Sequence, residues 1–187
     1  MEKKKMLLVL NPQVDFITGA LPIPGASRAM DSLADYVRTH GSDYVVRLVA
    51  CKWHPYNHSA FIHKGGKLPA HCVQHSVGAA VWQALLDSLN ETKGGFTMLY
   101  SGQQVNLDEC SVMQNPTSAD IVLRLIVALE IEQVDICGLP GDTCVLASAS
   151  DLAQAVGTLS VRVLESCTAS FDDGTALKSF LSRPCAD

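Results

Sequence analysis

Five short apolar runs recur along this chain, and amphipathic or loop-like sequence separates them. The runs cover residues 6–10, 44–51, 96–100, 134–139 and 159–164. Helical periodicity covers residues 26–39, 79–89, 116–131 and 144–156, and it returns from about Thr175. Buried strands that alternate with helices are typical of βαβ units. We therefore predict an α/β fold, a three-layer α/β/α sandwich with a mostly parallel central sheet.

Composition narrows the class of protein. The 187 residues are 48% apolar and 18% charged, which predicts one globular domain over residues 1–187. A net charge of −5 gives no reason to expect nucleic acid. No apolar run approaches the roughly 20 residues that cross a bilayer, so no membrane partner is expected. Seven cysteines without paired spacing favour a reducing, cytoplasmic location.

Cys144 stands where a buried strand turns into a helix. Residues 134–139 form the strand, residues 140–143 turn the chain, and Cys144 opens the helical pattern. The N–H groups and dipole of a helix N-terminus favour thiolate over thiol, which makes Cys144 a candidate nucleophile. Asp15 follows the first strand, at the sheet edge where α/β proteins bind ligands. The alternatives are a small buried hydrophobe for Cys144 and a turn or capping role for Asp15.

Four segments together resemble the nicotinamidase (pyrazinamidase) branch of the isochorismatase-like cysteine hydrolases. They are VLNPQVDF at 9–16, WHPYNH at 53–58, PAHCV at 69–73 and GLPGDTCV at 138–145. The resemblance implies the three-layer fold and an Asp–Lys–Cys triad that hydrolyses a small carboxamide through a thioester. It also implies a divalent metal, often zinc, beside the triad, and assembly into homo-oligomers.

Carried over position by position, the resemblance makes Cys144 the nucleophile and Asp15 the acid/base that takes the thiol proton. It implies metal ligation by His54, His58 and His71, and imidazoles do suit zinc. Residues expected to contact substrate are Phe16, Leu68, Tyr100, Pro140 and Thr143. The histidines at positions 40, 63 and 75 match no motif and are expected at the surface.

Three positions depart from the family pattern. Lys52 stands where the family has a carboxylate metal ligand, and an ammonium repels a cation. The family lysine is matched either by Lys93 or, in the register that we prefer, by Ser101 at the end of a strand. Pro140 lacks the backbone N–H that family members use to stabilise an oxyanion, a loss typically worth about 10²–10³ in rate.

These departures leave three functional readings. The first is an amidohydrolase that acts on nicotinamide or a related small carboxamide. The second is a catalytically impaired paralogue that keeps fold and pocket as a binding or assembly protein. The third is an isochorismate-type hydrolase without a metal. We also hypothesise that Lys52 extends into the former metal cavity and supplies a positive charge there.

Overall fold

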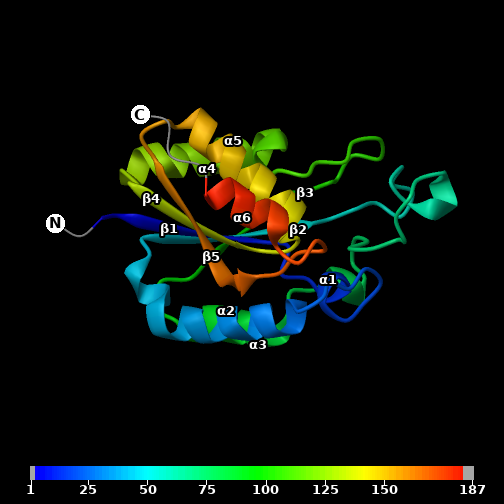
Figure 1. The fold of residues 1–187 in the computed structure, drawn as a ribbon, viewed down its shortest axis with the longest axis horizontal. Coiled ribbons are helices and arrows are strands. Elements are labelled where there is room, and N and C mark those ends of the chain that lie inside the picture. Colours follow the sequence, from blue (N-terminus) through cyan, green and yellow to red (C-terminus); the bar gives the residue numbers. More distant parts are fainter. Residues whose placement is uncertain (1–2, 183–187) are drawn as a thin grey trace.

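The computed structural model describes residues 3–182, and its centre is one five-stranded sheet (Figure 1). The strands lie in the order β3-β2-β1-β4-β5, and all four pairings are parallel. Their bounds are β1 Lys5–Leu10, β2 Val46–Lys52, β3 Thr97–Ser101, β4 Gln133–Gly138 and β5 Ser160–Thr168. The predicted fold class is confirmed, with a sheet that is entirely rather than mostly parallel.

Helices cover both faces of the sheet. Helix α2 (Ala26–His40) packs beside α3 (Gln83–Glu91) below the sheet in Figure 1. Helices α4 (Pro116–Leu129) and α5 (Leu146–Ala155) lie above it, and α6 (Thr175–Leu181) contacts α5. Three layers result, as predicted.

Strand alternation explains why both faces need cover. Leu7 and Val9 of β1 belong to the hydrophobic core between the sheet and α2, whereas Met6, Leu8 and Leu10 belong to the core on the opposite face of the sheet. Successive side chains of a strand point to opposite faces, so a uniformly apolar strand must be buried on both sides. This continuous apolarity is the reason that β1 lies at the centre of the sheet.

The main differences from the predicted bounds concern α3, α5 and β5. Helix α3 begins at Gln83, not at residue 79, because a 3₁₀ turn at Val77–Ala79 precedes it. Helix α5 begins at Leu146, after one π-helical turn over Gly141–Val145 that contains Cys144. Strand β5 continues to Thr168 and has an irregular register against Gly138 of β4, which the apolar pattern alone did not indicate.

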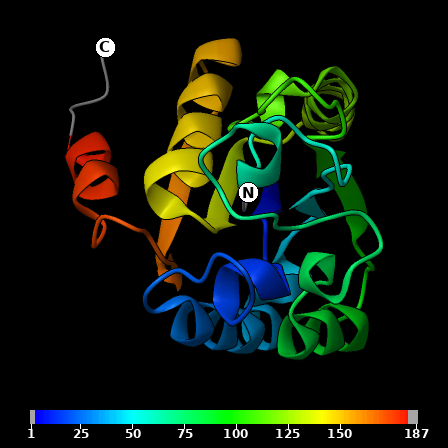
Figure 2. The same ribbon diagram turned by 90° about the vertical axis from the view of Figure 1, so that its right-hand side faces the viewer.

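Long connections gather at the carboxyl ends of the strands, at the right of Figure 1. They include the short helix α1 (Val14–Ile17), the segment 53–76 after β2 and the segment 102–111 after β3. Figure 2 views this edge directly and shows the green-cyan segment crossing in front of the strands. Among residues 3–182, no helix combines the length and apolarity that a bilayer span requires.

Candidate active site

Asp15 is held in place by two backbone donors. Its Oδ2 accepts a hydrogen bond of 2.6 Å from the N–H of Cys72, and its Oδ1 accepts one of 2.9 Å from the N–H of Ala20. The side chain is buried with only 8% of its surface exposed. The carboxylate thus joins α1 to the segment that follows β2, and its position is fixed by backbone rather than by other side chains.

Cys144 lies at the carboxyl end of the adjacent strand β4, inside the π-helical turn. It is 6% exposed, and this burial raises the pKa of the thiol above its ordinary value. The positive charge of Lys52 and hydrogen bonding to Thr143 and Asn11 act in the opposite direction without cancelling the burial. The helix terminus therefore does not make a resting thiolate, contrary to the expectation from sequence, because desolvation disfavours the charged form.

Asn11 and Cys72 connect the Asp15 and Cys144 regions. The Nδ2 of Asn11, just after β1, donates to the carbonyl of Leu139 at 2.7 Å, beside the cis Leu139–Pro140 peptide. Burial raises the pKa of the Cys72 thiol, and the charges of Asp15 and of Cys144 raise it further. The Asp15 carboxylate and the Cys144 thiol thus both act electrostatically on the Cys72 side chain.

The three predicted histidines do form one cluster. The ring centroids of His54 and His58 lie 4.3 Å apart, and those of His54 and His71 lie 5.1 Å apart. All three are buried, and Phe61 packs against them at 5.5–5.6 Å. The other histidines, at positions 40, 63 and 75, are exposed as expected.

Hydrogen bonds determine which ring nitrogens are available. The Nδ1 atoms of His54 and His71 lie 2.9 Å from the carbonyls of Gly102 and Pro69. A carbonyl can only accept, so both Nδ1 atoms carry the proton and each neutral ring presents a bare Nε2. Burial, then the charges of His71, Lys52 and His58, lower the pKa of His54 to about 3, so this ring is neutral at physiological pH.

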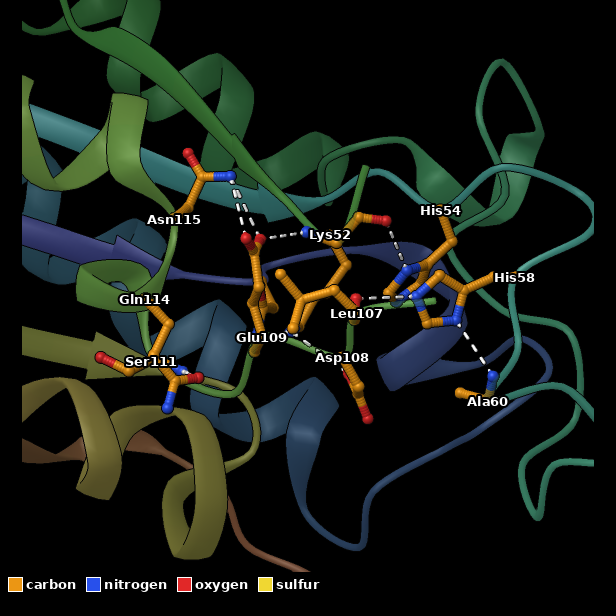
Figure 3. A network of polar contacts seen from close by, with 12 residues as sticks. Lys52, His54, His58, Ala60, Leu107, Asp108, Glu109, Ser111, Gln114 and Asn115 are labelled. Atoms are coloured by element: carbon orange, nitrogen blue, oxygen red, sulfur yellow. Dashed lines mark hydrogen bonds and ion pairs between the residues drawn. The ribbon is translucent and has the colours of Figure 1, made fainter. Parts of the chain in front are cut away.

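His58 is bonded in the opposite way. The N–H of Ala60 donates to its Nδ1 at 3.2 Å, so the proton is on Nε2, which donates to the carbonyl of Leu107 at 3.1 Å (Figure 3). Both ring nitrogens are thereby occupied. This arrangement argues against the predicted metal role of His58, because no lone pair remains for a ligand bond.

Lys52 ends β2 and points into the protein rather than to solvent. Its residue is 4% exposed, and its Nζ donates to the backbone carbonyl of Glu109 and lies 4.0 Å from Oδ1 of Asp108. Burial is the largest influence on three nearby groups: it raises the pKa of Cys144 and lowers the pKa of His54 and of His71. The charge of Lys52 lowers the pKa of all three. The charge of the ammonium therefore acts on both the thiol and the histidine cluster.

These donors do not fit a divalent metal. Only two imidazole nitrogens remain, whereas protein zinc sites use three or four ligands. An ammonium occupies the position expected of the carboxylate ligand, and like charges repel. Within residues 3–182, no group of three or more histidine, cysteine or acidic side chains has metal-binding geometry.

Lys93 does not lie with the other candidate residues. It is exposed, and its carbonyl accepts a 3.0 Å hydrogen bond from Arg47, near the start of β2 and so at the opposite end of the sheet. Ser101 instead ends β3 in register with Lys52 and is buried. A hydroxyl therefore stands at the end of β3, beside the end of β2.

The predicted substrate-binding residues are spread over several surfaces. Phe16 is buried and meets the His71 ring edge-on at 5.4 Å. Leu68 lines a hollow of about 440 Å³ together with Asp108, which adjoins Lys52. Thr143 faces a separate hollow of about 630 Å³ with Cys110.

Pro140 and Tyr100 complete this set. Pro140 is buried at the cis peptide that precedes the Cys144 turn, and it offers no N–H. Tyr100 is 37% exposed and packs against Trp53 with ring centroids 5.3 Å apart. Its contacts are with Trp53 rather than with the histidine cluster.

Three further residues shape this region, and sequence reasoning missed them. Gln13 hydrogen-bonds both backbone groups of Lys52. Glu109 accepts from Gly102 N–H at 2.7 Å and from Asn115 Nδ2 at 3.1 Å (Figure 3). Gly78 packs so closely on the Asp15 carboxylate that a Cβ there would overlap it. Only the position of Gln13 inside the first motif gave a sequence signal.

Comparison with known proteins finds a relative over nearly the whole chain. The chain is 27% identical over 180 residues to the nicotinamidase/pyrazinamidase of Mycobacterium tuberculosis, covering 92% of this chain and 90% of that protein. No protein-family model matches the sequence.

Solved structures share the fold. Pyrazinamidase of Pyrococcus horikoshii in complex with zinc has a TM-score of 0.81 at 25% identity, covering 96% of this chain and 95% of that one. PnC1 from L. infantum in complex with nicotinate has a TM-score of 0.78 at 27% identity, covering 96% and 87%. The chain is therefore similar in sequence and in fold to nicotinamidases and pyrazinamidases.

Proposed function

We propose that this protein is an amidohydrolase that cleaves nicotinamide or a related small carboxamide. The observation that carries the proposal is that a buried carboxylate, Asp15, and a buried thiol, Cys144, lie in the segments that follow the neighbouring strands β1 and β4. The nicotinamidase relative and the nicotinate-bound neighbour support the choice of substrate class.

The reaction follows from a neutral thiol beside a general base. Asp15 takes the thiol proton as the Cys144 sulfur attacks the amide carbonyl carbon. When the C–N bond breaks, the same proton goes to the leaving nitrogen, which departs as ammonia and leaves a thioester. Water then adds to the thioester with Asp15 as base, and the acid leaves as the proton returns to sulfur. Because the pKa of Cys144 is raised by burial, the base is needed for the first step.

A second candidate function is supported by the oxyanion position. Pro140 presents no N–H, and Ser101 supplies no charge, so stabilisation of the tetrahedral intermediate is weaker than in a family member with both groups. On this reading the chain binds small amides without turning them over efficiently.

Ammonia release from nicotinamide separates the two functions. We expect wild type to release ammonia and Cys144→Ala to release none above background, with Asp15→Asn reduced by at least about 10². Cys110→Ala, which changes an exposed cysteine, is the matched control and should keep full activity. Equal background rates in wild type and Cys144→Ala would refute hydrolysis of this substrate and favour the binding role.

A further inference from the structure

The Lys52 side chain is built into the site from two directions. From the backbone side, the Gln13 carboxamide holds Lys52 by its N–H and its carbonyl at 2.8 Å each. From the side-chain end, Nζ donates to the carbonyl of Glu109. With this much of the chain fixed, the ammonium has few alternative positions.

The acceptor of that ammonium is itself anchored. The Glu109 carboxylate is 1% exposed and accepts from Gly102 N–H and from Asn115, so the segment 102–111 is tied down next to β3 (Figure 3). Asp108 of the same segment lies 4.0 Å from Nζ. A buried ammonium needs such partners, because an unpaired charge in the interior is costly.

The same segment orients the histidines. The carbonyl of Gly102 accepts a hydrogen bond from His54 and so fixes its proton on Nδ1. The carbonyl of Leu107 accepts a hydrogen bond from Nε2 of His58. A side chain at position 102 would overlap the His54 ring, so the glycine permits this approach. The segment 102–111 thus positions both the ammonium and the imidazoles.

We propose that Lys52 supplies the fixed positive charge of this site in place of a divalent metal, so the wild-type protein does not use His54 and His71 to hold zinc. A zinc-bound pyrazinamidase has the same fold, and the family resemblance implies a carboxylate ligand at position 52, so Lys52 is the residue to test. The proposal concerns the site of the proposed function, but its test reads metal binding and not turnover, so either can fail alone.

The test is zinc and cobalt binding by wild type, Lys52→Asp and Lys52→Met, each with and without His71→Ala. Lys52→Asp removes the ammonium and adds a carboxylate beside two available imidazoles, which completes three protein ligands. We expect Lys52→Asp to bind one equivalent, more than about tenfold tighter than wild type, and to lose this binding with His71→Ala. Lys52→Met should gain no site, because it adds no ligand.

Cobalt(II) absorption distinguishes the intended site from adventitious binding to the free cysteines, since thiolate ligation gives intense charge-transfer bands. A wild-type protein that binds one equivalent of zinc and loses it with His71→Ala overturns the proposal. This comparison needs no engineered carboxylate, so it stays decisive even if Lys52→Asp does not fold. A folded Lys52→Asp protein that gains no metal also overturns it.

Discussion

The carboxamide of Gln13 pairs with the backbone of Lys52: its Nε2 donates to the Lys52 carbonyl and its Oε1 accepts from the Lys52 N–H, both at 2.8 Å. Nε2 also donates to the carbonyl of Ala79 at 2.9 Å. Gln13 has no exposed surface. One side chain therefore joins the end of β2 to the turn that packs on Asp15.

Gln13→Leu should destabilise the protein strongly. The change leaves one N–H and two carbonyls without this partner in a buried place, at about 1–3 kcal/mol for each unsatisfied group. We expect a loss of at least about 3 kcal/mol in the free energy of unfolding, measured by urea denaturation. Gln83→Leu is the control, because the exposed Gln83 amide donates to the exposed Asp87, and the change should alter stability by less than about 0.5 kcal/mol.

Gly78→Ala should displace the Asp15 carboxylate. A Cβ at position 78 would overlap the carboxyl group, which is itself held by the Cys72 and Ala20 N–H groups and cannot move without losing them. We expect ammonia release to fall by at least about 10², since misplaced catalytic groups cost that much. Gly157→Ala, at a position with open space around it, should leave the rate unchanged. Equal rates for both variants would contradict the tight placement of Asp15.

The thiol of Cys144 should react slowly at neutral pH. Burial raises its pKa, so the reactive thiolate becomes abundant only in more alkaline solution than for an ordinary cysteine. Iodoacetamide labelling, followed peptide by peptide by mass spectrometry, should modify exposed Cys110 before Cys144 at pH 7.5. The Cys144 rate should still be rising above pH 9.

Lys52→Met extends this test. The Lys52 charge lowers the pKa of Cys144, so its removal should shift the labelling profile of Cys144 to still higher pH. A shift to lower pH would mean that the ammonium does not act on the thiol.

Asp135 should make stability depend on acidity. Burial alone would raise its pKa, but hydrogen bonds from Arg162, Tyr44 and Gln133 outweigh that effect and lower it. A carboxyl with a lowered native pKa stabilises the fold above its unfolded pKa of about 3.9, and the stabilisation is lost as the pH falls through the native pKa.

Arg162→Met tests this dependence. It should cost about 1.5–3 kcal/mol at pH 7, the range for hydrogen bonds to charged groups, and much less below pH 3. Urea midpoints at the two pH values measure the difference. Arg124→Met, which removes an exposed ion pair with Asp120, is the control and should cost under about 1 kcal/mol.

Most of the fold could be predicted because its causes are local. The strands at residues 6–10 and 134–139 are buried on both faces of the sheet. Their mainly apolar residues predict this burial. The predicted helix starts were too early where a turn continues the helical pattern of apolar residues. The Val77–Ala79 and Gly141–Val145 turns both precede helices and contain helix-compatible residues.

The candidate site was predicted only in outline. The motifs that contain Asp15, Cys144 and the three histidines follow predicted strands. Because parallel strands end at the same edge of a sheet, the sequence predicted that these residues lie at one edge. The match to Lys93 was ambiguous because a lysine–glycine pair does not show whether it stands before or after a strand. Lys93 stands before β3. Glu109 and Gly78 carried no local signal at all.

The sequence by itself determined the order of buried strands, the edge at which chemistry gathers and the presence of an ammonium at position 52, because these depend on residue type and on periodicity along the chain. Only the tertiary structure decided the ionisation of the Cys144 thiol, the protonated nitrogen of each histidine and the partner of Lys52. The physical reason is that burial and hydrogen bonding set these states, and both come from segments such as 102–111 that are distant in the chain and adjacent in space.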